Sequence, residues 1–368
     1  MKLFRTFLAL GFLSVLPCTP AATNEHAGHN HASHKHDDCD CDHPESRAPI
    51  GVMGDHQHGQ GEFMASYRYM FMSMDGNRMG DTELSVSQIG TGGGLGFPIV
   101  PTRMYMQMHM LGGMYALTDR VTLMGMLPIK DIRMDHVNVL GVSGPAGSNF
   151  RTTSSGPGDL TLSALTRIFE NEHNSLHLNL GFSLPLGSIS ERDFAPSPGS
   201  PTFQEVVLPY PMQLGSGTID LRPGLTWLGQ NEDWSWGAQS VATLRLGRNR
   251  HNYSLGDQIE ASTWISRRIN SWVSSSVRLR GLAWGNIDGR DPRLPTVGPL
   301  GFPVETMDPN RRGGTRMDIL FGANIQIGSG WLKGHRIGLE AGMPLQQYLD
   351  GPQLQTDWTM TAGWQYAF

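Results

Sequence analysis

Hydrophobic and polar residues alternate along most of this chain. From residue 63 onward the apolar positions recur with a period of two, in segments separated by turn residues. Such segments are typical of strands that cross an outer membrane as a β-barrel. Twelve segments can be placed, at 63–74, 103–117, 120–131, 158–169, 174–186, 216–228, 235–247, 255–269, 272–285, 314–328, 335–346 and 355–368. The sequence therefore predicts an all-β fold, a transmembrane outer-membrane β-barrel of about 12 antiparallel strands, over residues 61–368.

The two faces of the predicted strands differ in polarity. Ile319 and Phe321, for example, alternate with Arg316 and Asp318. We expect the apolar faces to meet lipid and the polar faces to line the lumen. Ten titratable residues belong to the predicted lumenal faces: Asp159, His177, Asp220, Arg222, Glu260, Arg278, Arg280, Arg316, Asp318 and Glu340. They either set selectivity or, as is more common in barrels, brace the polar interior.

The last strand and the connections indicate how the barrel is inserted and oriented. Trp358, Trp364, Tyr366 and the final residue Phe368 share one face. This arrangement resembles the C-terminal strand by which outer-membrane proteins are recognised, so barrel-insertion machinery and outer-membrane lipid are the expected partners. Short connections alternate with long ones, and short turns face the periplasm. Twelve strands then place both chain ends in the periplasm of a Gram-negative bacterium.

The N-terminal residues have the layout of a secretory signal peptide. Lys2 and Arg5 precede an apolar stretch, and small residues end at Ala21 and Ala22, which predicts a signal peptide over 1–22. Lipidation of Cys18 is the alternative, but Pro17 is a poor neighbour for that cleavage.

The segment that follows is rich in potential metal ligands. Residues 23–60 contain few apolar side chains, and we expect them to form a disordered tail in the periplasm. Its imidazoles and thiols suit copper, nickel or zinc, although their irregular spacing defines no single site. The candidate ligands are His26, His29, His31, His34, His36, Cys39, Cys41, His43, His56 and His58. A merely solvated leader is the alternative interpretation.

Methionine is concentrated in the first three predicted strands. Alternation places these residues on the polar, lumenal face: Met70, Met72, Met74, Met104, Met106, Met108, Met110, Met114, Met124 and Met126. Thioether sulfur is a soft ligand that favours Cu(I) or Ag(I). The alternative is that Met fills space flexibly. Arg103 and His109 fall on the opposite, nominally lipid-facing side, which requires that this part of the strand stands above the bilayer.

Composition removes several classes of function. The formal net charge is −5 and no Lys/Arg-rich block occurs, so nucleic acid is not an expected partner. All three Cys lie within the first 41 residues, so the barrel holds neither disulfides nor thiolate ligands. The sequence contains no nucleophile elbow, HExxH or phosphate-binding loop, and we predict that the protein is not an enzyme and needs no obligatory cofactor.

Several stretches resemble the bacterial outer-membrane transporter family described as "MetA-pathway of phenol degradation". They include ALTDRVTLMGMLP (116–128), GPGDLTLSALTRIF (156–169), GSGTIDLRPGLTWLG (215–229), GGTRMDILFGANIQI (313–327) and MPLQQYLDGPQLQTDWTMTAGWQYAF (343–368). Two Met-rich stretches, YRYMFMSMDGNRMG (67–80) and PTRMYMQMHMLGGMYALTDR (101–120), resemble a branch associated with heavy metals. The resemblance implies an outer-membrane barrel over about residues 60–368 and a transport function.

These observations predict an outer-membrane channel or transporter. The main hypothesis links it to binding, efflux or tolerance of copper, silver or a similar soft metal, through the tail and the Met-lined lumen. The first alternative is a channel for small aromatic or hydrophobic compounds, with Met as an adaptable apolar lining. The second is an outer-membrane protein that sequesters metal while its lumen stays closed.

Overall fold

The computed structural model describes residues 44–90, 95–296, 301–328 and 330–368. The predicted signal peptide and most of the predicted tail lie outside the described residues. The same holds for eight of the candidate metal ligands: His26, His29, His31, His34, His36, Cys39, Cys41 and His43.

Long antiparallel strands make up most of the described chain. They are β1 (Phe63–Gly80), β3 (Ile99–Thr118), β4 (Val121–Asn138), β6 (Leu160–Glu170), β7 (Asn174–Leu184), β10 (Asp220–Gln230), β11 (Trp234–Arg245), β13 (Gln258–Arg268), β14 (Val273–Trp284), β16 (Gly314–Gln326) and β17 (His335–Ala367). Shorter elements are β2 (Thr82–Leu84), α1 (Val86–Ile89), β5 (Ser148–Pro157), β8 (Arg192–Ala195), β9 (Gln204–Val207), η4 (Tyr210–Met212), β12 (Tyr253–Ser254), β15 (Asp288–Gly289), η6 (Glu305–Met307) and η7 (Pro309–Arg311).

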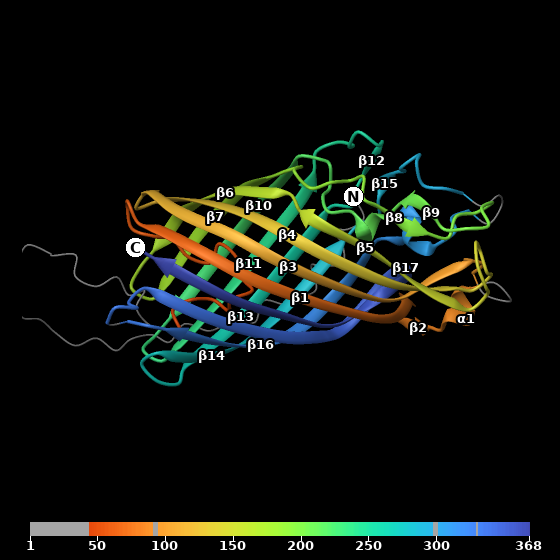
Figure 1. The fold of residues 1–368 in the computed structure, drawn as a ribbon. Coiled ribbons are helices and arrows are strands. Elements are labelled where there is room, and N and C mark those ends of the chain that lie inside the picture. Colours follow the sequence, from red (N-terminus) through yellow and green to blue (C-terminus); the bar gives the residue numbers. More distant parts are fainter. Residues whose placement is uncertain (1–43, 91–94, 297–300, 329) are drawn as a thin grey trace, which may run out of the picture. The chain divides into compact units, whose positions relative to one another are not determined.

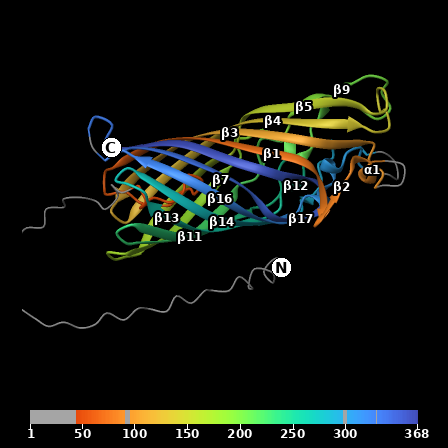
Figure 2. The ribbon, with the colours of Figure 1, turned by 90° about the horizontal axis from the view of Figure 1, so that it is seen from below.

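The eleven long strands form one sheet that closes on itself between β17 and β1. Strand β17 folds back as a hairpin. Its first part pairs with β16 and its second part with β1, and its two ends meet where His335 stacks on Tyr366 at 4.3 Å. The wall is therefore crossed twelve times, which confirms the predicted barrel. Figures 1 and 2 show the strands winding around this closed wall.

The two ends of the barrel differ. At one end, called the terminal end here, the Phe63 amide donates to the Phe368 carbonyl at 2.9 Å and the strands are joined by short turns. At the other, called the loop end, long connections carry β8, β9, β12, β15 and the short helical turns (Figures 1 and 2). These connections pack on one another through an apolar cluster that includes Tyr210, Tyr253, Ile287 and Val304.

Strands β1, β3 and β4 run further toward the loop end than the alternation predicts, and β5 pairs with the extension of β4. Outward charges on this extension are matched across the strands. Arg103 lies 2.6 Å from Asp75, and Arg151 lies 2.6 Å from Asp135. The hydroxyl of Tyr67 is 2.7 Å from His109 Nδ1. Polar residues occupy both faces of these extensions. Alternation of apolar and polar positions therefore cannot identify them as strands.

Apolar residues on the outer face of the remaining wall are exposed, as expected of side chains that meet lipid. Leu111, Leu162 and Phe321 are 49%, 46% and 58% exposed. Among the described residues, no helix is long and apolar enough to cross a membrane.

Candidate functional site

Residues 44–62, called the plug here, lie inside the barrel near the terminal end. Seven wall strands contribute a hydrogen bond to it. The pairs are Ser274 with the Pro44 carbonyl (2.8 Å), Arg336 with the Ala48 carbonyl, Arg68 with the Ile50 carbonyl (3.0 Å), Gln239 with the Met53 carbonyl (3.0 Å), His177 with the Gly54 carbonyl (2.9 Å), Gln57 with the Leu165 carbonyl (2.9 Å) and the His58 amide with Thr122 (3.3 Å). The plug therefore spans the lumen.

Apolar side chains of the plug also fit the wall. Ala48, Ile50 and Val52 are at most 2% exposed. Ile50 sits over two glycines of β17: a Cβ atom added to Gly338 would lie 2.7 Å from Ile50 Cβ, and one added to Gly363 would lie 2.7 Å from Ile50 Cγ1. The expected disorder of residues 23–60 thus does not extend over 44–60. The polar wall supplies hydrogen-bond partners that this segment lacks on its own.

The ten titratable residues expected in the lumen do face inward, and most of them bind each other or the plug. Arg278 lies 2.7 Å from Glu340, and Asp318 lies 2.6 Å from Arg280 and 3.0 Å from Arg316. The other pairs are Asp220 with Arg245, Arg222 with Thr161 (3.1 Å), Arg278 with Glu260 (3.9 Å), Asp159 with the Ser216 amide (2.7 Å) and His177 with Gly54. This arrangement favours cross-bracing of the interior.

Two histidines of the plug form a buried pair. The rings of His56 and His58 are 4.9 Å apart. His56 Nδ1 donates to Asp55 at 2.8 Å and His58 Nδ1 to Glu62 at 3.3 Å, whereas both Nε2 atoms are buried without a hydrogen-bond partner among the described residues. Burial, reinforced by the nearby charge of Arg47, lowers the pKa of His56 to about 3 and that of His58 to about 4.

Both imidazoles are therefore neutral at pH 7, the form that binds metals, and a carboxylate orients each one as in many metal sites. The Arg47 charge opposes a cation at this position. No group of three or more His, Cys, Asp or Glu side chains placed to hold a metal ion occurs in the part of the chain that the structure describes.

The ten candidate methionines of β1, β3 and β4 lie on the inward face, as the alternation predicts, whereas Met79 near the end of β1 is exposed. Met104, Met110 and Met114 are buried, while Leu111 and Tyr115 on the opposite face are exposed. The sulfur side chains also lie opposite one another across the strands. The cross-strand partners are Met70 with Met108, Met72 with Met106, Met74 with Met104, Met104 with Met134, Met64 with Met114, Met114 with Met124, and Met126 with Gly112.

Part of this methionine wall serves as ordinary packing. Met64, Met114 and Met124 surround Leu165, near the plug. Met104 and Met134 pack against Leu208, Met212 and Leu214, which belong to the long connection between β7 and β10. These contacts agree with the alternative in which Met fills irregular space, because its unbranched side chain adapts to gaps.

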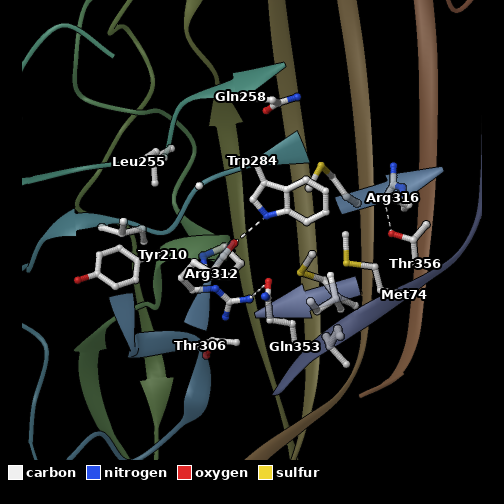
Figure 3. A pocket seen from close by; sticks show the side chains of 18 of the residues that line it. Met74, Tyr210, Leu255, Gln258, Trp284, Thr306, Arg312, Arg316, Gln353 and Thr356 are labelled. Atoms are coloured by element: carbon white, nitrogen blue, oxygen red, sulfur yellow. Dashed lines mark hydrogen bonds between the residues drawn. The ribbon is translucent and has the colours of Figure 1, made fainter. Parts of the chain in front are cut away.

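A cavity of about 310 Å³ opens where the methionine wall meets the loop end (Figure 3). Its apolar lining comprises Met74, Met104, Met106, Met134, Tyr210, Pro211, Leu255, Trp284, Ile287, Leu349 and Leu354. Its polar lining comprises Arg245, Gln258, Thr306, Arg312, Arg316, Gln347, Gln353 and Thr356.

The sequence predictions include only some of these cavity residues. Trp284 has the same strand parity as the predicted lumenal residues Arg278 and Arg280, so the alternation contains a signal for it. Tyr210 and Arg312 come from long connections, and no periodic pattern points to them.

Comparisons place this fold among solved outer-membrane proteins. The sequence matches no protein-family model and no curated protein. The crystal structure of the COG4313 outer membrane channel from Pseudomonas putida F1 is 14% identical, covers 87% of this chain and 100% of its own, and gives a TM-score of 0.59. The transport unit of the autotransporter AIDA-I from Escherichia coli is 9% identical over 87% and 94%, with a TM-score of 0.46. The P. putida toluene transporter TodX is 10% identical over 85% and 91%, with a TM-score of 0.37.

At 14% identity the likeness to the first of these structures concerns the fold alone. That neighbour is described as an outer-membrane channel. Membership of the phenol-degradation family and of its Met-rich, metal-associated branch stays an interpretation of the sequence. The chain has the fold of an outer-membrane β-barrel protein.

Proposed function

We propose that this protein is an outer-membrane channel that admits small molecules with an apolar, ring-sized body. The lining of the cavity at the loop end carries the proposal. A volume of about 310 Å³ lies in the range of small-molecule sites, and four Met side chains and Trp284 form part of its apolar lining. Met adapts to apolar ligands of different shape, and sulfur makes favourable contacts with aromatic rings.

The orientation follows from the connections. Short turns of bacterial barrels face the periplasm, so we propose that the terminal end, the plug and the predicted N-terminal tail lie on that side. The cavity then opens toward the outside. Because the plug contacts the wall around the lumen, passage into the periplasm requires the plug to shift.

A variant with a filled cavity tests this function. In Met106→Trp the indole occupies space in the cavity, whereas the neighbouring outward residue provides the matched control Gln107→Trp. We expect calorimetry to show that the purified wild-type protein binds both benzamide and benzoate. The affinity for each ligand should fall by at least about tenfold in Met106→Trp and should equal that of the wild type in Gln107→Trp. The proposal would be contradicted if the two variants had the same affinity for these ligands, or if the wild-type protein bound the polar sugar arabinose as tightly as it binds benzamide.

A second candidate function, soft-metal binding or export, is favoured by one observation. The inward methionines lie in cross-strand pairs, and paired thioethers suit Cu(I) or Ag(I). The neutral imidazoles of His56 and His58 add nitrogen ligands in the plug. We rank this function second because three arginines and, among the described residues, no carboxylate line the cavity, which opposes the passage of a bare cation.

Leucine substitutions separate the two candidates. Leu keeps the bulk of Met but has no sulfur, so changing Met104, Met106, Met108 and Met110 to Leu should abolish Ag(I) binding only if the sulfurs are ligands. Met317→Leu with Met343→Leu is the control, since both side chains face outward. Deleting residues 24–43 should remove Cu(II) or Zn(II) binding by the predicted tail while the plug stays in the chain. Metal bound without any passage through reconstituted protein would instead support sequestration.

A further inference from the structure

The charged groups of the cavity all have one sign. Arg245, Arg312 and Arg316 line it, and no Asp or Glu of the described chain does. Their counter-charges lie behind the lining. Arg245 is paired with Asp220, whereas Arg316 must share Asp318 with Arg280. The cavity therefore presents an excess of positive charge to anything that enters it.

Arg312 carries this excess most directly. It ends the connection before β16, where its carbonyl accepts from Trp284 Nε1 at 2.7 Å and its amide donates to Asn286 at 2.7 Å. The guanidinium donates to the side chain of Gln353 at 2.7 Å. Its Nη1 atom is buried and has no hydrogen-bond partner among the described residues. Figure 3 shows the Arg312 carbonyl beside Trp284 and the Arg312 guanidinium beside Gln353, so a cationic side chain and an aromatic ring line the same cavity.

The carboxyl group with the largest electrostatic effect on Arg312 does not neutralise it at pH 7. Glu305 in η6 is fully buried, and burial raises its pKa to about 8, so it is mostly protonated. Burial also lowers the pKa of Arg312, to about 10, which still leaves the guanidinium charged. Asp308, the other carboxyl group that acts on Arg312, is paired with Arg311 at 2.9 Å. A bound anion would supply the missing partner of Arg312.

From this juxtaposition we infer that the cavity selects small organic anions that carry an apolar ring, of which an aryl carboxylate is the simplest. The carboxylate accepts a hydrogen bond from Arg312 Nη1, and the ring packs on Trp284 and on the methionine side chains. Charge-assisted hydrogen bonds are stronger than neutral ones, so the anion is preferred to a neutral molecule of the same shape. The inference rests on the proposed channel function and adds charge selectivity to it.

Benzoate and benzamide provide the test, since they have nearly the same shape and differ in charge. We expect calorimetry on the purified full chain at pH 7 to show at least about tenfold tighter binding of benzoate than of benzamide, because charge-assisted hydrogen bonds are stronger than neutral ones. Arg312→Gln should reduce the ratio of benzoate affinity to benzamide affinity to about one, while benzamide still binds. The control is Arg103→Gln, an outward arginine paired with Asp75.

The outcomes distinguish failure of the charge selectivity from failure of the proposed channel function. Equal binding of both ligands by wild type, or an unchanged preference in Arg312→Gln, would overturn the charge selectivity and leave a neutral-ligand channel. Binding of neither ligand by wild type would overturn the channel proposal itself. The comparison on wild type needs no substitution, so the inference is testable even if Arg312→Gln does not fold.

Discussion

Replacing Ile50 with alanine tests whether the plug closes the barrel by packing. Ile50 is 1% exposed and fills the space that Gly338 and Gly363 leave in the wall. Truncation of a buried Ile to Ala costs roughly 2–5 kcal/mol. Within the described residues, the only covalent link between the plug and the wall is at Phe63, where β1 begins. We therefore expect the lost packing to favour release of the plug rather than unfolding of the hydrogen-bonded strands.

The lower bound of that cost, about 2 kcal/mol, corresponds to about a 30-fold increase in the population with a displaced plug. Single-channel recording in planar bilayers measures it as the fraction of time that the channel conducts. Ile337→Ala is the matched control, because Ile337 adjoins Gly338 but faces lipid at 51% exposure. Open time that is equal in Ile50→Ala and wild type, or equally raised in Ile337→Ala, would refute the reasoning.

Three further substitutions test the contact of the wall with the plug, the buried ion pair of the lumen and the stability of the loop end. Gly363→Ala should also raise the open time, because the added Cβ would lie 2.7 Å from Ile50 Cγ1; an unchanged recording would show that the wall adapts instead. Arg278→Ala should lower the free energy of unfolding in urea by roughly 3–5 kcal/mol, since it leaves Glu340 buried and unpaired, whereas Arg151→Ala at the exposed pair with Asp135 should cost about 1 kcal/mol or less. The folded-state pKa of Glu305 is raised to about 8, so its contribution to stability should fall as pH rises from about 4.5 to about 8. Proteolysis of residues 286–313 should therefore accelerate over that range in wild type, and a Glu305→Gln variant with the same acceleration would count against this assignment.

Local patterns were sufficient for the wall of the barrel. A period of two is set by the geometry of a single strand, so the alternation around Ile319 and Phe321 identifies both the strand and its lipid face without knowledge of its neighbours. The same alternation correctly predicted that the methionines of β3 lie on the inward face. It was insufficient for β5 and the extensions of β1, β3 and β4, where Arg151 and Asp135 face outward beside other polar residues.

The plug and the cavity depend on contacts between residues far apart in the chain. Ala48 is held by Arg336, and Ile50 fits only because two glycines of β17 leave room for it. No property of residues 44–60 by themselves indicates such a partner, and their composition predicts disorder. The pairing of Arg278 with Glu340 was likewise invisible, since the sequence places both in the lumen but gives no distance between their strands.

The amino-acid sequence by itself determined a closed β-barrel with a sulfur-rich inner wall, because strand alternation is encoded by neighbouring residues. The predicted signal peptide lies outside the described residues, so export stays a prediction. Only the tertiary structure decided that the segment before β1 fills the lumen and that Arg312 and Trp284 meet beside the methionines. Those features arise when a loop or the segment before β1 folds against a wall formed by many strands. The free energy of each such contact depends on both residues in it, which lie far apart in the sequence.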